Sequence, residues 1–199
     1  MKIKSYIFLS ASALIIFLII NTTNFQKKNE MGVLLLPSLP MPIAKEYALI
    51  TSAGQSSEAY IINDIANKLM IHNYFMPQAK EFDLNGISSV VFAVGYSPLG
   101  EKLNSINYED EKKRLTSLIK KAKEKKLILI AVYIGGKERR DKKTEELLNI
   151  ICPESNYIIG TKDANYDGFL SELAKGSRIP LTLIKEVSDL AEPFASAFR

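Results

Sequence analysis

The sequence predicts one α/β domain over residues 45–199, with three layers around a mostly parallel sheet of about six strands, of Rossmann-like or flavodoxin-like type. Two observations predict it. From Tyr47 onward, short β-branched runs alternate with segments in which apolar residues recur every three or four positions. The most apolar runs, 87–94 and 127–134, have no polar face, which is typical of parallel strands covered by helices on both sides.

The first half of the domain alternates strands with one helix. The run 47–51 is short and apolar, which predicts a strand, and 72–76 and 87–94 predict the next two. Between the first two strands, 57–71 is predicted to be a helix because apolar residues recur at helical spacing on one face: Ile61, Ile62, Ile65, Ala66 and Leu69.

The second half begins with a highly charged helix at 108–125 and a strand at 127–134, which ends at a pair of glycines. The helix has a narrow apolar stripe of Leu115, Leu118, Ile119 and Ala122, so its many lysines are interpreted as a solvated outer face rather than a binding patch. The remaining expected elements are helices at 142–151, 166–175 and from about 187, and strands at 157–159 and 181–185.

The N-terminus predicts attachment to a membrane. Residues 1–21 combine a basic start with an apolar run, Tyr6 to Ile20, that is near the lower limit of about 17 residues for a spanning helix. The run lacks small residues at its end where a signal peptidase would cut, so an uncleaved anchor is favoured over a cleaved signal peptide. The domain would then lie outside the cell membrane, with a membrane-protein partner possible, or be secreted in the alternative case.

Residues 22–44 predict an extended linker, because Pro37, Pro40 and Pro42 exclude a helix there. Residues 1–44 together explain most of the net charge of +4, since the rest of the chain carries 22 basic and 21 acidic residues. A domain with nearly equal numbers of basic and acidic residues lacks the positive surface that nucleic acid requires, so no nucleic-acid partner is expected. Cys152 is the only cysteine, which excludes an internal disulfide and predicts a buried structural thiol.

Candidate ligand-binding residues follow the first strand, because ligands of open α/β sheets bind at the carboxyl ends of the strands. The free amides and the helix dipole of this loop suit a phosphate or carboxylate, and the alternative is that Ser56 only caps the helix while Glu58 answers its dipole. The predicted binding residues here are Ser52, Gly54, Gln55, Ser56 and Ser57.

Two further strand-end loops are candidates. After the strand at 127–134, Gly135 and Gly136 precede Arg139 and Arg140, whose forked guanidinium groups suit carboxylate or phosphate oxygens. The alternative is that Asp141 caps the next helix and the arginines pair with surface acids. After the strand at 87–94, a flexible rim supplies Gly95, Tyr96 and Ser97.

Metal and catalytic motifs are weak. The stretch Asp163–Gly168 has the spacing that opens a calcium loop, but the twelfth position is Ala174 where a glutamate is needed, so a turn before a helix is expected and no metal site. The single histidine, His72, is predicted to lie away from the strand ends, which argues against a serine or cysteine triad. No catalytic residue and no cofactor is therefore assigned.

Four segments together resemble an uncharacterised family of small exported bacterial proteins, over about residues 46 to 190: Thr51–Ser56, Gly135–Arg140, Asn165–Gly168 and Ile179–Leu183. The resemblance implies a secreted or membrane-anchored bacterial α/β domain. Thr51–Ser56 is also weakly similar to the flavodoxin phosphate loop, although Ala53 replaces an expected hydroxyl. That similarity implies a flavin mononucleotide (FMN)-binding protein as an alternative function.

We therefore expect a non-enzymatic binding or accessory protein that takes a small anionic ligand at the strand ends. Gly54 and the amides of Ser56 and Ser57 would cradle the anion, and Arg139 and Arg140 would clamp its charge. The alternatives are a flavodoxin-like FMN-binding protein and an enzyme of unknown reaction.

Overall fold

The computed structural model describes residues 33–199. The predicted anchor at Tyr6 to Ile20 lies outside the described residues. Among the helices from residue 33 onward, none is both long enough and apolar enough to cross a membrane.

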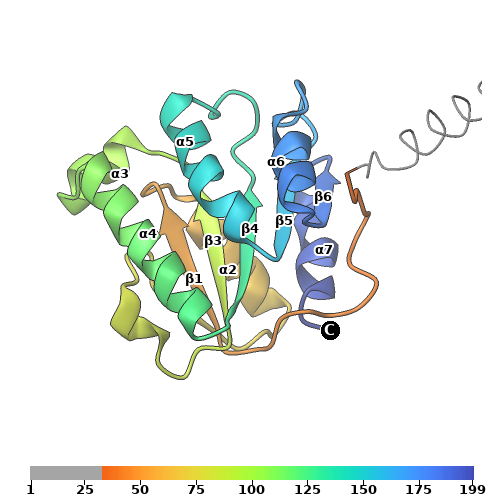
Figure 1. Cartoon of the computed structure of the whole chain (residues 1–199), viewed down its shortest axis with the longest axis horizontal. Helices are drawn as coiled ribbons and strands as arrows, with labels where there is room; N and C mark the ends of the chain where they lie inside the picture. The colour runs from red at the N-terminus through yellow and green to blue at the C-terminus, as the bar shows by residue number, and fades with distance from the viewer. Residues whose placement is uncertain (1–32) are drawn as a thin grey trace, which may run out of the picture. The chain divides into compact units, whose positions relative to one another are not determined.

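The centre of the domain is one parallel six-stranded sheet in the order β2-β1-β3-β4-β5-β6, which confirms the predicted α/β class (Figure 1). Because the order reverses direction between β1 and β3, this is a doubly wound sheet, and its ligand crevice is expected at the carboxyl ends of the strands around that point. The strands are β1 Ala48–Ala53, β2 Asn73–Phe75, β3 Ser89–Val94, β4 Ile128–Tyr133, β5 Tyr157–Thr161 and β6 Leu181–Ile184.

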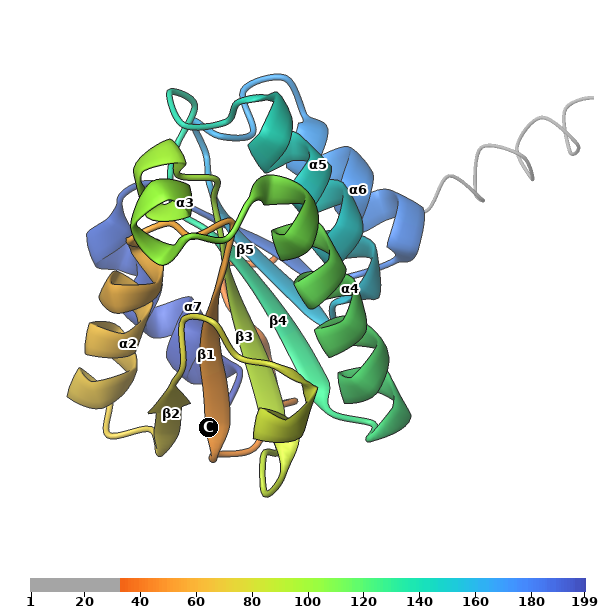
Figure 2. The same ribbon diagram turned by 90° about the vertical axis from the view of Figure 1, so that its left-hand side faces the viewer.

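Helices cover both faces of the sheet. Figure 2 shows α4, α5 and α6 on one face and α2 and α7 on the other, and a separate apolar core fills each interface. Within residues 33–199 the α-helices are α2 Glu58–Lys68, α3 Pro98–Asn104, α4 Tyr108–Glu124, α5 Lys142–Ile151, α6 Phe169–Ser177 and α7 Ala191–Ser196. Short 3₁₀ turns are η1 Glu81–Leu84, η2 Cys152–Glu154 and η3 Val187–Leu190.

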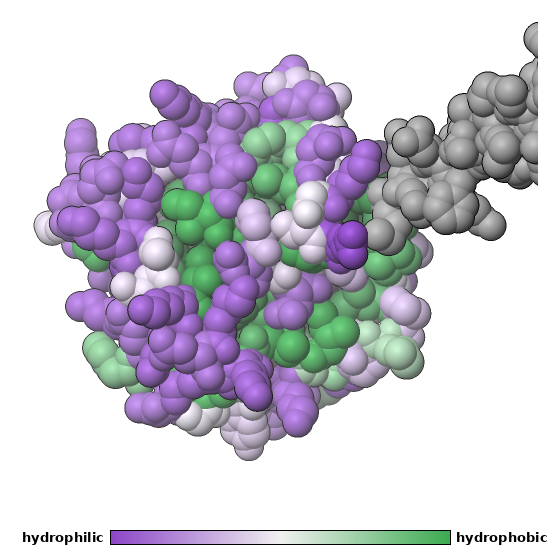
Figure 3. All heavy atoms as spheres, in the orientation of Figure 1, coloured by the Kyte–Doolittle hydropathy of each residue, from purple (hydrophilic) through white to green (hydrophobic). Residues whose placement is uncertain are grey.

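The lysines of α4 face outward, as predicted. The outer side of the helix is hydrophilic in Figure 3, and Lys113 and Lys121 pair with acids on the same helix, Asp110 and Glu124. The predicted buried thiol is also confirmed, because Cys152 is fully buried and burial raises its pKa to about 12.

The segment after β3 is not the flexible rim that the sequence analysis expected. It forms α3, because Ser97 Oγ caps the first turn by accepting the N–H of Gly100 at 3.1 Å, and Pro98 supplies a first residue already set for a helix. The helix buries none of its residues. It therefore lies over the strand ends as a thin cover rather than as part of the core.

The described end of the expected linker, residues 33–44, is extended and packs against the domain (Figure 1). The N–H of Leu36 donates to the carbonyl of Leu181, and the N–H of Leu181 donates to the carbonyl of Leu34, each at 2.9 Å. Leu39 and Ala44 are buried in the core beside α7. This segment therefore covers the edge of β6, which would otherwise expose unpaired backbone groups.

Candidate functional site

A cleft of about 360 Å³ opens at the carboxyl edge of the sheet, next to β1 and β2. Its walls come from the end of β1, the first turns of α2, the segment after β2, η1 and the last residue of α3. A cleft of this size is at the lower end of the range for small-molecule sites, about 300–1,000 Å³. Its lining residues are Ser52, Gln55, Ser56, Tyr60, Met76, Pro77, Gln78, Ala79, Asp83 and Asn104.

The loop after β1 forms one wall of the cleft, and its backbone needs a glycine. Gly54 has φ +109°, which is unfavourable for other residues, and a Cβ there would overlap the carbonyl of Gly95 and lie 2.6 Å from Leu147 Cδ1. Gln55 follows with φ +65°, an unusual value for a residue with a side chain. The surrounding contacts must therefore hold this loop in place.

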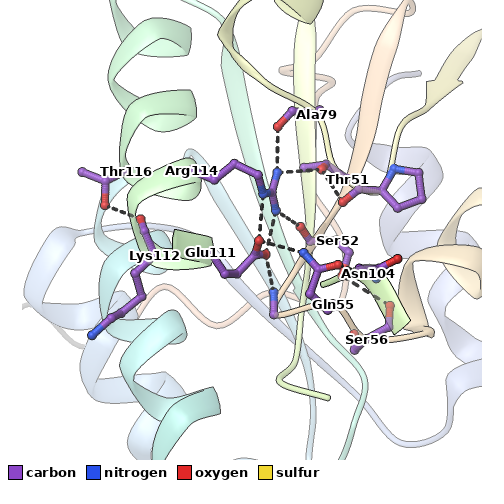
Figure 4. A network of polar contacts seen from close by, with 12 residues as sticks. Thr51, Ser52, Gln55, Ser56, Ala79, Asn104, Glu111, Lys112, Arg114 and Thr116 are labelled. Carbon is purple, nitrogen blue, oxygen red and sulfur yellow. Dashed lines mark hydrogen bonds and ion pairs between the residues drawn. The ribbon is translucent and has the colours of Figure 1, made fainter. Parts of the chain in front are cut away.

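Glu111 of α4 provides those contacts (Figure 4). One carboxylate oxygen accepts the backbone N–H of Gly54 at 2.9 Å, and the other accepts the side-chain amide of Gln55 at 2.7 Å. The Glu111 side chain is 1% exposed. An internal carboxylate thus occupies the Gly54 amide that the sequence analysis expected to be open to an external anion.

Arg114, one turn further along α4, balances the charge of Glu111 and ties down the cleft floor. Its guanidinium meets both Glu111 oxygens, at 2.7 and 2.8 Å. It also donates to the carbonyls of Ser52 at 2.6 Å and Ala79 at 2.7 Å (Figure 4). The end of β1 and the segment after β2 are therefore fixed to each other through one buried ion pair.

Gln55 also connects α3 to the cleft. Its side-chain oxygen accepts the amide of Asn104 at 2.7 Å, while its nitrogen donates to Glu111. Gly100 packs so closely on the carbonyl of Gln55 that a Cβ at position 100 would overlap it. α3 therefore closes the space above the loop after β1.

Two buried polar atoms near this loop have no hydrogen-bond partner within residues 33–199: Ser56 Oγ and Glu58 Oε2. Buried polar atoms are nearly always satisfied, by protein, water or ligand. A Cβ on Gly95 would lie 3.1 Å from Ser56 Oγ, so the hydroxyl lies between the ends of β1 and β3. Neither Ser56 nor Ser57 caps α2 through its side chain, which corrects the expected capping role of Ser56.

A second group of charges, which we call the arginine cluster, consists of Arg139, Arg140, Glu58, Glu145 and Asp167. Arg139 pairs with Glu58. Arg140 binds both carboxylate oxygens of Asp167, one at 2.7 Å, and lies 3.1 Å from Glu145. The hydrogen bond from Arg140 lowers the pKa of Asp167 to about 2. The cluster joins the β4–α5 and β5–α6 loops, and each guanidinium group in it already faces a carboxylate.

Tyr96 is part of a third polar group. Its N–H donates to Thr144 Oγ1 at 3.1 Å and its hydroxyl donates to Glu101. Lys143 Nζ lies 2.8 Å from the Tyr96 hydroxyl and 4.1 Å from the ring centroid. The hydrogen bond to Tyr96 raises the pKa of Lys143, and the one from Tyr96 lowers the pKa of Glu101. These contacts attach α3 to α5.

A family model described as a domain of unknown function (DUF6305) matches residues 45–198. The chain belongs to this family. The predicted membership of an uncharacterised family is confirmed over nearly the whole described domain. No curated protein and no solved structure matches the chain.

In this DUF6305 domain the predicted binding residues fall into separate places. Ser52, Gln55 and Ser56 line the cleft, and Gly54 lies behind them with its amide bound to Glu111. Ser57 is exposed at the start of α2. The others do not line the cleft: Gly95 packs on Ser56, Tyr96 and Ser97 hold α3, and Gly135, Gly136, Arg139 and Arg140 lie in or beside the arginine cluster.

The predicted alternatives for the second loop are present. Asp141 caps α5 by accepting the N–H of Thr144 at 2.7 Å, and Arg140 approaches Glu145. The turn expected at Asp163–Gly168 is also present, and it contributes Asp167 to the arginine cluster. No group of three or more His, Cys, Asp or Glu residues within 33–199 is placed to hold a metal ion.

The loop after β1 does not fit the phosphate of FMN. The Gly54 amide already donates to Glu111, and Gly100 covers the carbonyl of Gln55. Tyr133, the aromatic residue at the end of β4, is buried and donates its hydroxyl to the carbonyl of Gly136 at 2.7 Å, so its ring is not open to a flavin. Binding a flavin phosphate at this loop would require Glu111 and α3 to move.

The two charges that organise the site, Glu111 and Arg114, were not predicted, although the sequence contains a signal for them. Glu111 and Arg114 lie four residues before Leu115 and Leu118, so continuing the apolar stripe of α4 by one turn places both on the buried face. The cleft residues Tyr60, Gln78, Asp83 and Asn104 had no such signal, because four separate segments bring them together.

Proposed function

We propose that this chain is a small-molecule-binding protein that holds a polar ligand in the cleft at the carboxyl ends of β1 and β2. The observation that carries the proposal is the position of the cleft: it lies at the carboxyl edge of a doubly wound sheet, the edge at which α/β proteins bind ligands, and it lies on the β2 side of β1. Glu111 and Arg114 support the proposal because they hold the cleft floor before any ligand arrives.

Binding is favoured over catalysis by the chemistry of the lining. Among the lining residues, all within 33–199, Asp83 is the only one with an acidic or basic side chain. General acid–base catalysis usually needs a nucleophile or a substrate hydrogen within reach of a positioned base. The hydroxyls of Ser52 and Ser56 have no histidine, lysine or cysteine beside them in the cleft.

Binding of the expected anionic ligand at the arginine cluster stays a prediction. An anion there must replace the carboxylate of Glu58 or Asp167 on its guanidinium partner. Arg139 is the better candidate, because its side chain is 44% exposed whereas that of Arg140 is 3% exposed. The test is to titrate inorganic phosphate into wild type and Arg139→Ala. Binding to wild type that is weakened in the variant would support an anion site at Arg139.

We also propose that the domain works outside the cell membrane, held by the apolar segment Tyr6 to Ile20. The basic residues before this segment and the missing cleavage site support an uncleaved anchor. Mass spectrometry of the protein purified from cell membranes should find the N-terminal segment intact. A new N-terminus after residue 20 would contradict the anchor.

The binding function is tested with a thermal-shift screen of sugars, amines, carboxylates and phosphates on the full chain. A ligand at 100 times its Kd should stabilise the fold by about 2.7 kcal/mol. Gln78→Trp, which fills the cleft mouth, should abolish the shift. Ser117→Trp adds the same bulk on the exposed side of α4 and should leave the shift intact. Equal shifts in both variants would place the ligand elsewhere and contradict the proposal.

A further inference from the structure

Within residues 33–199, the lining of the cleft carries a single negative charge and no positive one. Of its lining side chains in the described part of the chain, Asp83 is the only one that is charged at neutral pH. The nearest buried cation under the floor, Arg114, is neutralised by Glu111 at 2.7 Å. An anion in the cleft would therefore meet an acid and no free cation, which costs affinity.

The cleft offers a ligand both hydrogen-bond donors and hydrogen-bond acceptors. Asp83 Oδ2 accepts the N–H of Lys80 at 2.8 Å, and within residues 33–199 nothing donates to its Oδ1. The amide of Gln78 and the hydroxyl of Tyr60 belong to exposed lining side chains, and the Ser56 hydroxyl is buried without a partner within residues 33–199. Acceptors and donors placed side by side suit ligand hydroxyl groups, which do both.

One wall of the cleft is apolar. Tyr60 is 61% exposed, and its ring is held in an edge-on contact with Phe75 at 4.7 Å between centroids. Met76 and Pro77 continue this wall. An exposed tyrosine ring offers a flat apolar face to a ligand and leaves its hydroxyl available for a hydrogen bond.

We propose that the cleft recognises a neutral, hydroxyl-rich ring, a single sugar unit, with the C–H face of the sugar on Tyr60 and its hydroxyls on Asp83 and Gln78. The inference rests on the proposed binding function and specifies its ligand class. The cleft volume of about 360 Å³ accommodates one such ring.

The test is isothermal titration and saturation-transfer NMR on the full chain, in a detergent without a sugar headgroup. The probes are six monosaccharides including glucose, mannose and N-acetylglucosamine, with inorganic phosphate, citrate and putrescine as charged probes. At least one monosaccharide should bind. Its affinity should fall at least tenfold in Tyr60→Ala and about tenfold in Asp83→Asn, where a charged acceptor becomes neutral. Tyr74→Ala, a matched tyrosine on β2 outside the cleft, should bind normally.

The outcomes separate this inference from the proposed function. If phosphate, citrate or putrescine binds and Gln78→Trp blocks it while no monosaccharide binds, the sugar inference is wrong and the binding function stands. If a monosaccharide binds equally to wild type and Tyr60→Ala, the inference is also overturned. If no probe of any class depends on Gln78, both the inference and the binding function fail.

Discussion

Two ion-pair groups lie at the same edge of the sheet and differ in what they hold. The Glu111–Arg114 pair is buried, with side chains 1% and 7% exposed, and its hydrogen bonds end on the backbone of Gly54, Ser52 and Ala79. In the arginine cluster, Arg140 is buried but its partner Asp167 is 41% exposed. The first pair shapes the cleft, whereas the second joins two loops.

The two groups differ mainly in the burial of the carboxylate, because Arg140 is also buried and also donates to a backbone carbonyl, that of Ala164. A buried charge without its partner is costly because it has lost water and gains nothing in return. An exposed carboxylate returns to water when its partner is removed. Removing one residue from each group therefore tests the comparison directly.

The largest effect is expected for Arg114→Ala. The substitution leaves the Glu111 carboxylate buried without a cation and removes the donors to Ser52 and Ala79. The free energy of unfolding should fall by about 3–5 kcal/mol, measured by urea denaturation. The double variant Glu111→Leu with Arg114→Met should be less destabilised than Arg114→Ala. The ion-pair account would be contradicted if the double variant lost as much stability as the two single variants, Glu111→Leu and Arg114→Met, lose in total.

A smaller effect is expected for Arg140→Ala. Arg140 packs over the rings of Tyr166 and Phe169, at 4.7 and 5.1 Å, and binds Asp167. Losing these contacts should reduce the free energy of unfolding by about 1–3 kcal/mol, because Asp167 is free to rehydrate. A loss equal to that of Arg114→Ala in the same denaturation assay would remove the distinction between the two groups.

Acid should weaken the arginine cluster in a defined pH window. The pKa of Asp167 is about 2 in the folded protein, against 3.8 for the free side chain, so its ion pair contributes fully above about pH 4. The contribution disappears as the pH falls from about 4 towards 2. Melting temperatures should therefore differ between wild type and Asp167→Asn at pH 6, and most of this difference should be lost at pH 2. A difference at pH 2 as large as that at pH 6 would assign the effect to another group.

The smallest effect is expected for Lys113→Ala. It is the control for Arg114→Ala, because Lys113 directly precedes Arg114 in α4. Lys113 pairs with Asp110 at 3.2 Å, but both side chains are more than half exposed. The free energy of unfolding should change by less than about 0.5 kcal/mol in the same urea experiment. A loss above about 1 kcal/mol would mean that exposed pairs on this helix also support the fold.

Local patterns were sufficient to predict most of the architecture. The strands and the long helices appeared within a few residues of their observed positions, and α5 has the predicted bounds, Lys142–Ile151. These elements were predictable because burial of one face or both leaves a regular apolar spacing in the sequence. α3 was missed although Ser97 and Pro98 carry a helix-start signal, because the helix buries no side chain and so has no apolar spacing.

The site shows where sequence reasoning ended. The residues after β1 could be chosen from the sequence alone, because any parallel strand directs its following loop to the carboxyl edge of the sheet. The Gly54 amide is not free because it donates to Glu111, 57 positions away. The guanidinium of Arg140 is not free because it binds Asp167, 27 positions away. Such partners leave no local spacing. Hydrogen bonds and ion pairs act over a few ångströms in space, so only the folded chain decides which charge remains available to a ligand.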